Sequence, residues 1–172
     1  MLFIVKSYIK FLSNSTNEHG VHSPFVFDFV MKCIYDKTNY PEYEVLKNYR
    51  KFLLENKNTI EVTDFGAGSR IFKSNNREIA KIAQTAGISQ KNAELLFRIV
   101  RYFQPKTILE IGTSLGLATS ALSSGNQNAE IISLEGCPNT MAITKEMFQN
   151  SSFKFNAENI KFVNTKFEDY LS

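Results

Sequence analysis

The spacing of apolar residues changes near residue 105, and this change separates two kinds of predicted structure. Before it, apolar residues recur every three or four positions, which is the period of an amphipathic helix. After it, short runs rich in β-branched residues alternate with helical stretches, as in strands joined by crossover helices. We therefore expect helices in the first part of the chain and a parallel sheet in the second.

Helices are predicted at five places in the first part. They cover "MLFIVKSYIKFLSNS", "SPFVFDFVMKCIYDK", "YPEYEVLKNYRKFLLENK", "NREIAKIAQTAG" and "SQKNAELLFRIVRYFQP". Ser23 and Ser89 are typical N-cap residues, and Pro24 and Pro41 suit the first helical turn, where a missing N–H costs nothing. Gly87 is expected to end the fourth helix.

Two of these helices have an apolar face that predicts burial. The first helix is expected to pack on the core, and so is the fifth. Their predicted buried positions are Leu2, Val5, Ile9 and Leu12 in the first, and Leu95, Leu96, Ile99 and Phe103 in the fifth. With 15 Phe and no Trp in 172 residues, the core is expected to be rich in phenylalanine.

Three strands are predicted in the second part, over "KTILEIG", "AEIISLEG" and "NIKFVNT". The helical stretches "LGLATSALSS" and "PNTMAITKEMFQN" separate them. Right-handed crossovers wind one way from the first strand, so the sheet order should be 3-2-1. The expected fold class is α/β, a Rossmann-like parallel sheet preceded by an all-helical N-terminal region. We divide the chain into a helical cap or lid region, 1–88, and half of a Rossmann-like domain, 89–172.

Two segments resemble the glycine turn of a nucleotide-binding fold, "TDFGAGSR" at 63–70 and "LEIGTSLG" at 109–116. A working turn needs a buried strand before it, a helix after it, and a second strand that ends in an acid about 20 residues on. The second segment meets these conditions: Gly112 and Gly116 bracket the turn, and the next strand ends in Glu135. Its carboxylate can accept both hydrogen bonds of a ribose diol.

The first segment fails the same test, because only a weak strand precedes it and basic, polar sequence follows. It is therefore interpreted as a loop, and two interpretations stay open. One is a plain glycine turn between helices. The other is a mobile loop over the active site, with Asp64 and Arg70 near the substrate.

Composition and charge narrow the class of function. The formal net charge of +3 is small and scattered, which argues against nucleic acid as a partner. Cys33 and Cys137 lie far apart, which argues against a metal site or a disulfide framework and fits a reducing cytoplasm. No apolar run reaches membrane-spanning length, and no small-residue cleavage site follows the N-terminus, so neither a membrane span nor a signal peptide is expected.

Two isolated features, a histidine pair and a cysteine, are judged structural rather than chemical. His19 and His22 lack nearby further ligands, so a helix-entry loop is favoured over a substrate lid or a metal site. Cys137 is interpreted as a tolerated small residue beside the cofactor, not a nucleophile.

The stretch "TILEIGTSLGLATSALSS" followed by "IISLEG" resembles the class I S-adenosylmethionine-dependent methyltransferases, and most closely small O-methyltransferases of the catechol and caffeoyl-CoA type. The resemblance implies S-adenosyl-L-methionine as cofactor and a small-molecule methyl acceptor, with a hydroxyl group as one candidate. It also implies which residues bind the cofactor. These are Glu110, Gly112, Thr113, Ser114 and Gly116 around the methionine part, Glu135 at the ribose, and Lys166 and Phe167 near the adenine.

The same resemblance implies a seven-stranded sheet, of which this sequence contains three strands, so we expect a protein truncated after the third strand. The family's bases and metal ligands follow the fourth and fifth strands. The catalytic residues are therefore unknown, and residues 1–172 alone are expected to show little methyl transfer. A first strand left at the sheet edge is expected to promote self-association.

Two other functions stay open. The alternative to an enzyme is a non-catalytic S-adenosylmethionine-binding module or a degenerate fragment. A nicotinamide-binding Rossmann protein is the weaker alternative, because "GTSLGLA" lacks the closely spaced glycines that admit a pyrophosphate.

Overall fold

The structure is a computed structural model that describes residues 2–15, 20, 22–65, 71–153 and 155–171. Its contacts separate two units, Met1–Lys37 and Thr38–Ser172. Segment 38–88 therefore belongs to the unit that contains the sheet. The proposed lid role of residues 1–88 is a matter of function and stays a prediction.

The first unit is helical. It consists of α1 (Leu2–Asn14), α2 (Pro24–Phe29) and the π-helix η2 (Val30–Ile34). Ser23 caps α2 as predicted, because its hydroxyl accepts a hydrogen bond from the Val26 amide. Within this unit the apolar face of α1 is not covered, because Leu2, Val5, Ile9 and Leu12 are 52–75% exposed, and packing of α1 on the core stays a prediction. The periodicity identified the helix correctly, but periodicity alone does not provide a surface to cover the apolar face.

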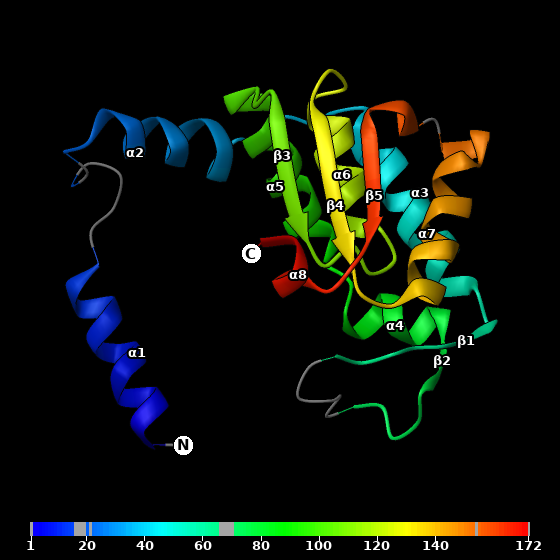
Figure 1. Cartoon of the computed structure of the whole chain (residues 1–172). Helices are drawn as coiled ribbons and strands as arrows, with labels where there is room; N and C mark the ends of the chain where they lie inside the picture. The colour runs from blue at the N-terminus through cyan, green and yellow to red at the C-terminus, as the bar shows by residue number, and fades with distance from the viewer. Residues whose placement is uncertain (1, 16–19, 21, 66–70, 154, 172) are drawn as a thin grey trace. The chain divides into compact units, whose positions relative to one another are not determined.

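Residues 38–172 contain the predicted parallel sheet. β3 (Thr107–Ile111), β4 (Glu130–Glu135) and β5 (Ile160–Asn164) lie in the order β3-β4-β5, joined by the crossover helices α6 (Leu117–Gly125) and α7 (Pro138–Gln149) (Figure 1). The register pairs Ile111 with Leu134 and Glu135 with Asn164, so the carboxyl ends of the strands meet at one edge. The predicted fold class and strand order are confirmed.

Helices cover one face of this sheet. α5 (Gln90–Phe103) and α6 lie behind it in Figure 1, and α3 (Glu42–Glu55) and α7 lie to the right of β5 there. The short helix α8 (Phe167–Leu171) crosses the front near the carboxyl ends. Ile131 and Ile160 point into the helix-covered core. On the other face, Leu109 and Ile111 are 46% and 52% exposed. The sheet is thus apolar on both faces but covered mainly on one.

The buried face of α5 differs from the prediction. Ala93, Phe97 and Val100 are buried, whereas Phe103 is exposed and the other predicted positions, Leu95, Leu96 and Ile99, are only partly buried. Gly125 at the end of α6 explains the choice of face. A Cβ at that position would lie 2.8 Å from both the Phe97 carbonyl oxygen and the Val100 Cβ, so the two helices touch through a position without a side chain.

The region before α5 is not purely helical. Thr59–Glu61 (β1) pairs antiparallel with Asn76–Glu78 (β2), and α4 (Ile79–Thr85) follows directly. The segment "TDFGAGSR" is therefore part of a hairpin connection, not a turn between helices as one interpretation held. The two strands are too short for their alternation to stand out from the surrounding polar sequence.

An aromatic cluster joins α3 to α7 and to the segment between α7 and β5. The buried Tyr49 ring contacts Phe148, Phe153 and Phe155 at centroid distances of 5.9, 5.0 and 5.1 Å, which confirms the phenylalanine-rich core. The Tyr49 hydroxyl donates to the Leu115 carbonyl oxygen at 2.7 Å. Since Leu115 lies between Gly112 and Gly116, α3 fixes the glycine turn from behind.

Candidate functional site

The glycine turn between β3 and α6 has a left-handed backbone at three positions. The φ angles are +96° at Gly112, +49° at Ser114 and +72° at Gly116. A Cβ on Gly112 would meet only the Phe167 Cζ, at 3.9 Å, so the space beside this residue is open. At Gly116 a Cβ would lie 2.6 Å from the Phe148 ring. Gly112 thus leaves room for a ligand, whereas Gly116 leaves room for α7.

Glu135 connects this turn with the next one. Its Oε2 accepts a hydrogen bond from the Ser114 amide at 2.8 Å, and its Oε1 accepts one from the Cys137 amide at 2.9 Å. Each carboxylate oxygen has two lone pairs, so the group retains acceptor capacity. The contact brings together the two parts of the predicted cofactor motif, which lie 21 residues apart.

Glu110 lies in a buried network instead of on the surface of the site. Its Oε2 accepts hydrogen bonds from Thr119 at 2.6 Å and from Ser133 at 2.5 Å, and the Ser133 hydroxyl also pairs with that of Thr113. Its Oε1 is buried and has no protein partner. Burial raises the pKa of Glu110 and the negative charge of Glu135 adds to this, while the two hydroxyl hydrogen bonds oppose it.

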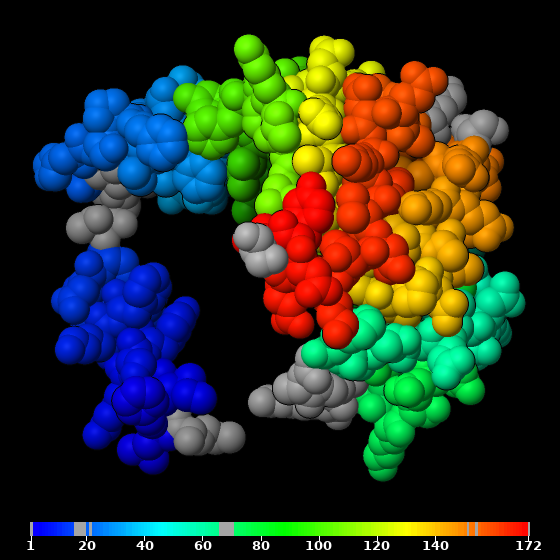
Figure 2. Space-filling model, viewed as in Figure 1, coloured from blue at the N-terminus to red at the C-terminus, as the bar shows by residue number. Residues whose placement is uncertain are grey.

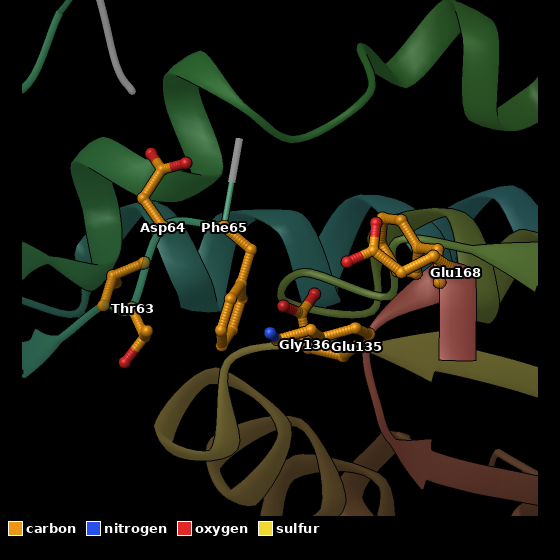
Figure 3. A pocket seen from close by; sticks show the side chains of 9 residues that line it. Thr63, Asp64, Phe65, Glu135, Gly136 and Glu168 are labelled. Carbon is orange, nitrogen blue, oxygen red and sulfur yellow. The ribbon is translucent and has the colours of Figure 1, made fainter. Parts of the chain in front are cut away.

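A cavity of about 330 Å³ lies beside Glu135. Its lining comes from three segments: Glu135 and Gly136 after β4, residues 166–168 after β5, and residues 62–65 of the hairpin connection. Figure 3 shows Phe65 reaching toward Gly136, with Glu135 beside it and Glu168 across the opening. A volume of this size is typical of a small-molecule site.

The structure brings some predicted site residues together and leaves others apart. Glu135, Lys166 and Phe167 line the cavity, and Gly112 faces the ring of Phe167. The buried Glu110 and Thr113, together with Gly116, are not among the lining residues. The cofactor roles assigned to all of these residues, Ser114 included, stay predictions.

Sequence reasoning missed Gly136 and Glu168, and among residues 62–65 it named only Asp64, in one of its two interpretations. Gly136 and Glu168 adjoin predicted positions, so extending the motif by one residue would have found them. Residues 62–65 come from a segment more than 70 positions earlier, and only its own glycine pattern drew attention to it. Of the two interpretations of "TDFGAGSR", a loop beside the site agrees better with Asp64 in the lining; Arg70 lies outside the described residues.

The cysteine and the two histidines singled out in the sequence are the remaining candidates. Cys137 is buried, and its Sγ accepts a hydrogen bond from the Thr63 amide at 3.3 Å. His22 is exposed, and His19 lies outside the described residues. Within the described ranges no three His, Cys, Asp or Glu side chains gather as metal ligands, and none of the helices there is long and apolar enough to span a membrane.

Comparison with solved structures supplies the context for this site. The SAH-bound methyltransferase PaMTH1 from Podospora anserina superimposes with a TM-score of 0.56 at 19% identity, over 92% of this chain and 55% of the other. The chain shares the Rossmann-like fold of this structure. Neither a protein-family model nor a curated protein matches the sequence.

Two further structures match this methyltransferase fold more loosely. A Klebsiella pneumoniae protein assigned as an O-methyltransferase aligns with a TM-score of 0.47 at 14% identity, over 80% of this chain and 49% of the other. A Staphylococcus aureus protein assigned as a caffeoyl-CoA O-methyltransferase aligns with a TM-score of 0.43 at 14% identity. The alignment covers 83% of this chain and 49% of the other. The chain thus spans about half the length of the structures it matches.

Proposed function

We propose that this protein binds S-adenosyl-L-methionine and serves methyl transfer to a small acceptor, with an O-methyltransferase as the finer assignment. The observation that carries the proposal is the hydrogen bond from the Ser114 amide to Glu135. It joins a left-handed glycine turn to an acid at the carboxyl ends of two parallel strands, where ligands bind in open α/β sheets. The SAH-bound fold relative supports the same ligand.

The residues present fit this cofactor. The open space beside Gly112 would receive the methionine part, and the remaining lone pairs of Glu135 would accept the ribose hydroxyl groups. The unpartnered Oε1 of Glu110 offers a buried acceptor behind the turn. When bound, the cofactor supplies an electrophilic methyl group on a sulfonium; the protein's part is to orient this group and exclude water.

The partners and location belong to the same proposal. We infer a small-molecule acceptor, no nucleic-acid or membrane partner, and self-association through the edge of β3. Both cysteines are buried and outside any disulfide bond, and we infer a reducing cytoplasm as the location. The alternative of a non-catalytic binding module shares the cofactor site and differs only in turnover.

Calorimetric titration with S-adenosylhomocysteine tests the proposal, and NADH is the matched comparison ligand. We expect binding of S-adenosylhomocysteine and none of NADH. Binding of NADH alone would favour the nicotinamide-binding alternative. A mass-spectrometric screen of hydroxyl-bearing acceptors then separates an enzyme from a binding module.

Substitution of the ribose acid gives the residue-level test. Glu135→Ala should weaken S-adenosylhomocysteine binding by about 1.5–3 kcal/mol, the range for a hydrogen bond to a charged group. Glu135→Gln retains an acceptor oxygen and should lose less. Glu130→Ala, at the exposed start of the same strand, is the control. An unchanged dissociation constant in Glu135→Ala would remove this residue from the site.

A further inference from the structure

The hairpin segment that lines the cavity is anchored to the loop after β4 and to the first turn of α7. The Thr63 amide donates to Cys137 Sγ at 3.3 Å, and Asn139 Nδ2 donates to the Glu61 carbonyl oxygen at 2.8 Å. Asp64 is paired with Arg77 at 3.1 Å in a partly buried contact. Figure 2 shows this part of the chain lying beneath α7 and α8. The wall formed by residues 62–65 is therefore held in place beside Glu135.

Phe65 occupies the place that a side chain of residue 136 would fill. A Cβ on Gly136 would lie 2.8 Å from the Phe65 Cδ2 and 3.2 Å from its Cε2. The ring is nevertheless 54% exposed, because its other side borders the cavity. The Lys166 ammonium lies 5.3 Å from the ring centroid. The ring therefore lines the cavity beside Glu135 and Gly136, with the Lys166 ammonium over it.

We propose that Phe65 is the stacking surface for the adenine base of the bound nucleoside. This inference rests on the proposed function, and it assigns the base-binding wall to the hairpin that precedes the α/β unit. A base is one glycosidic bond away from its ribose, so a ribose held by Glu135 places the base in the same cavity. Every base has a π-face, and stacking on an aromatic side chain stabilises it without requiring hydrogen bonds.

The lack of a side chain at Gly136 explains why the aromatic wall beside Glu135 comes from the hairpin and not from the loop after β4. Without a side chain at residue 136, the β4 loop offers no apolar surface of its own beside Glu135. The Phe65 ring takes that volume, and Gly136 admits it. Loss of either partner should therefore have the same result, namely a base without a stacking surface on this side.

The absence of tryptophan from the sequence allows a direct optical test. Phe65→Trp creates a single fluorophore in the proposed wall. Saturating S-adenosylhomocysteine should quench its emission, and the dissociation constant should stay within about twofold of the wild type, because an indole also stacks. Phe103→Trp is the control. Phe103 is an exposed ring at the end of α5, shortly before the amino end of β3, whereas the cavity lies at the carboxyl ends of the strands. The emission of this control should not respond.

Removal of the Phe65 ring is the second test of the proposal. Phe65→Ala should weaken S-adenosylhomocysteine binding by about five- to 150-fold, the range measured for base stacking on an aromatic side chain. Gly136→Ala, which displaces the ring, should weaken binding in the same direction. Phe103→Ala should leave the dissociation constant unchanged. Circular dichroism checks that each variant is folded.

The outcomes separate this inference from the function on which it rests. If Glu135→Ala weakens binding while Phe65→Ala and Phe65→Trp show neither weakening nor quenching, the stacking role is wrong and the cofactor site stands. If the wild type does not bind S-adenosylhomocysteine in calorimetry, both are overturned. Quenching in Phe65→Trp together with weakening in Phe65→Ala supports the assignment.

Discussion

At the scale of single residues, Glu110 contributes a charge in a place that disfavours it. The side chain is 8% exposed, and its pKa is raised by burial and by the neighbouring charge of Glu135. Below the ordinary carboxyl pKa of about 4.3, both the folded and the unfolded chain hold the proton. As pH rises, the unfolded chain releases it first, so the free energy of unfolding falls until the raised pKa is passed.

Glu110→Gln should remove this fall. The amide keeps an oxygen acceptor for Thr119 and Ser133 but carries no charge, so the melting temperature should depend less on pH above the ordinary carboxyl pKa of about 4.3. Thermal melts across this pH range measure the effect. Glu130→Gln, an exposed carboxyl on β4, is the control and should follow the wild type. Parallel curves for Glu110→Gln and wild type would show that Glu110 does not control this pH dependence.

At the residue level, the structure agrees with the expected proximity of two motif segments, and their cofactor roles stay predictions. Gly112 and Glu135 were expected in one site because a strand, a turn and a second strand follow in a fixed order, and the structure brings them together through Ser114. Phe65 was not expected there. Its placement depends on the contact between Thr63 and Cys137, which are 74 positions apart, and no short-range pattern encodes such a contact.

At the scale of elements, α3 stabilises a turn to which it is not adjacent in sequence. Tyr49→Phe removes the hydroxyl that donates to the Leu115 carbonyl and leaves that buried oxygen without its partner. The free energy of unfolding should fall by about 1–3 kcal/mol. Urea unfolding followed by circular dichroism measures it. Tyr8→Phe, at an exposed hydroxyl in α1, should change stability by less than about 0.5 kcal/mol.

The same substitution tests whether the turn needs this support to bind ligand. A looser Leu115 should raise the dissociation constant for S-adenosylhomocysteine, whereas a purely global effect on stability would leave binding unchanged at temperatures where the variant is folded. A Tyr49→Phe protein with wild-type stability would show that the hydrogen bond contributes little.

Among the elements, strands were easier to predict than helix faces. β3, β4 and β5 follow from short β-branched runs, and each was found where expected. In α5, two apolar stripes compete, and Gly125 on another helix decides which stripe is buried. Of the β1–β2 hairpin, β1 was recognised only as a weak strand and β2 was not predicted, because three-residue strands carry little alternation.

At the scale of the whole molecule, β3 forms one edge of the sheet. Among the described residues it pairs with β4 and with no other strand, and Leu109 and Ile111 beside this edge are about half exposed. Unpaired strand edges and exposed apolar faces favour association. Light scattering should therefore show a mass that rises with protein concentration.

Leu109→Lys should reduce this association, because a charge on an edge strand disfavours pairing with a second copy. Leu54→Lys, at an exposed apolar position of α3, is the control and should associate as the wild type does. A wild-type mass equal to one chain at millimolar concentration would contradict self-association through β3.

The contact between Phe65 and Gly136 has a consequence for how related sequences vary. One volume beside β4 is shared by two positions 71 residues apart, and it holds one large side chain. A homologue with a bulky residue at position 136 should therefore carry a small one at position 65, and the reverse. Covariation of side-chain size between these two positions would show that the hairpin and the β4 loop are in contact in the homologues too.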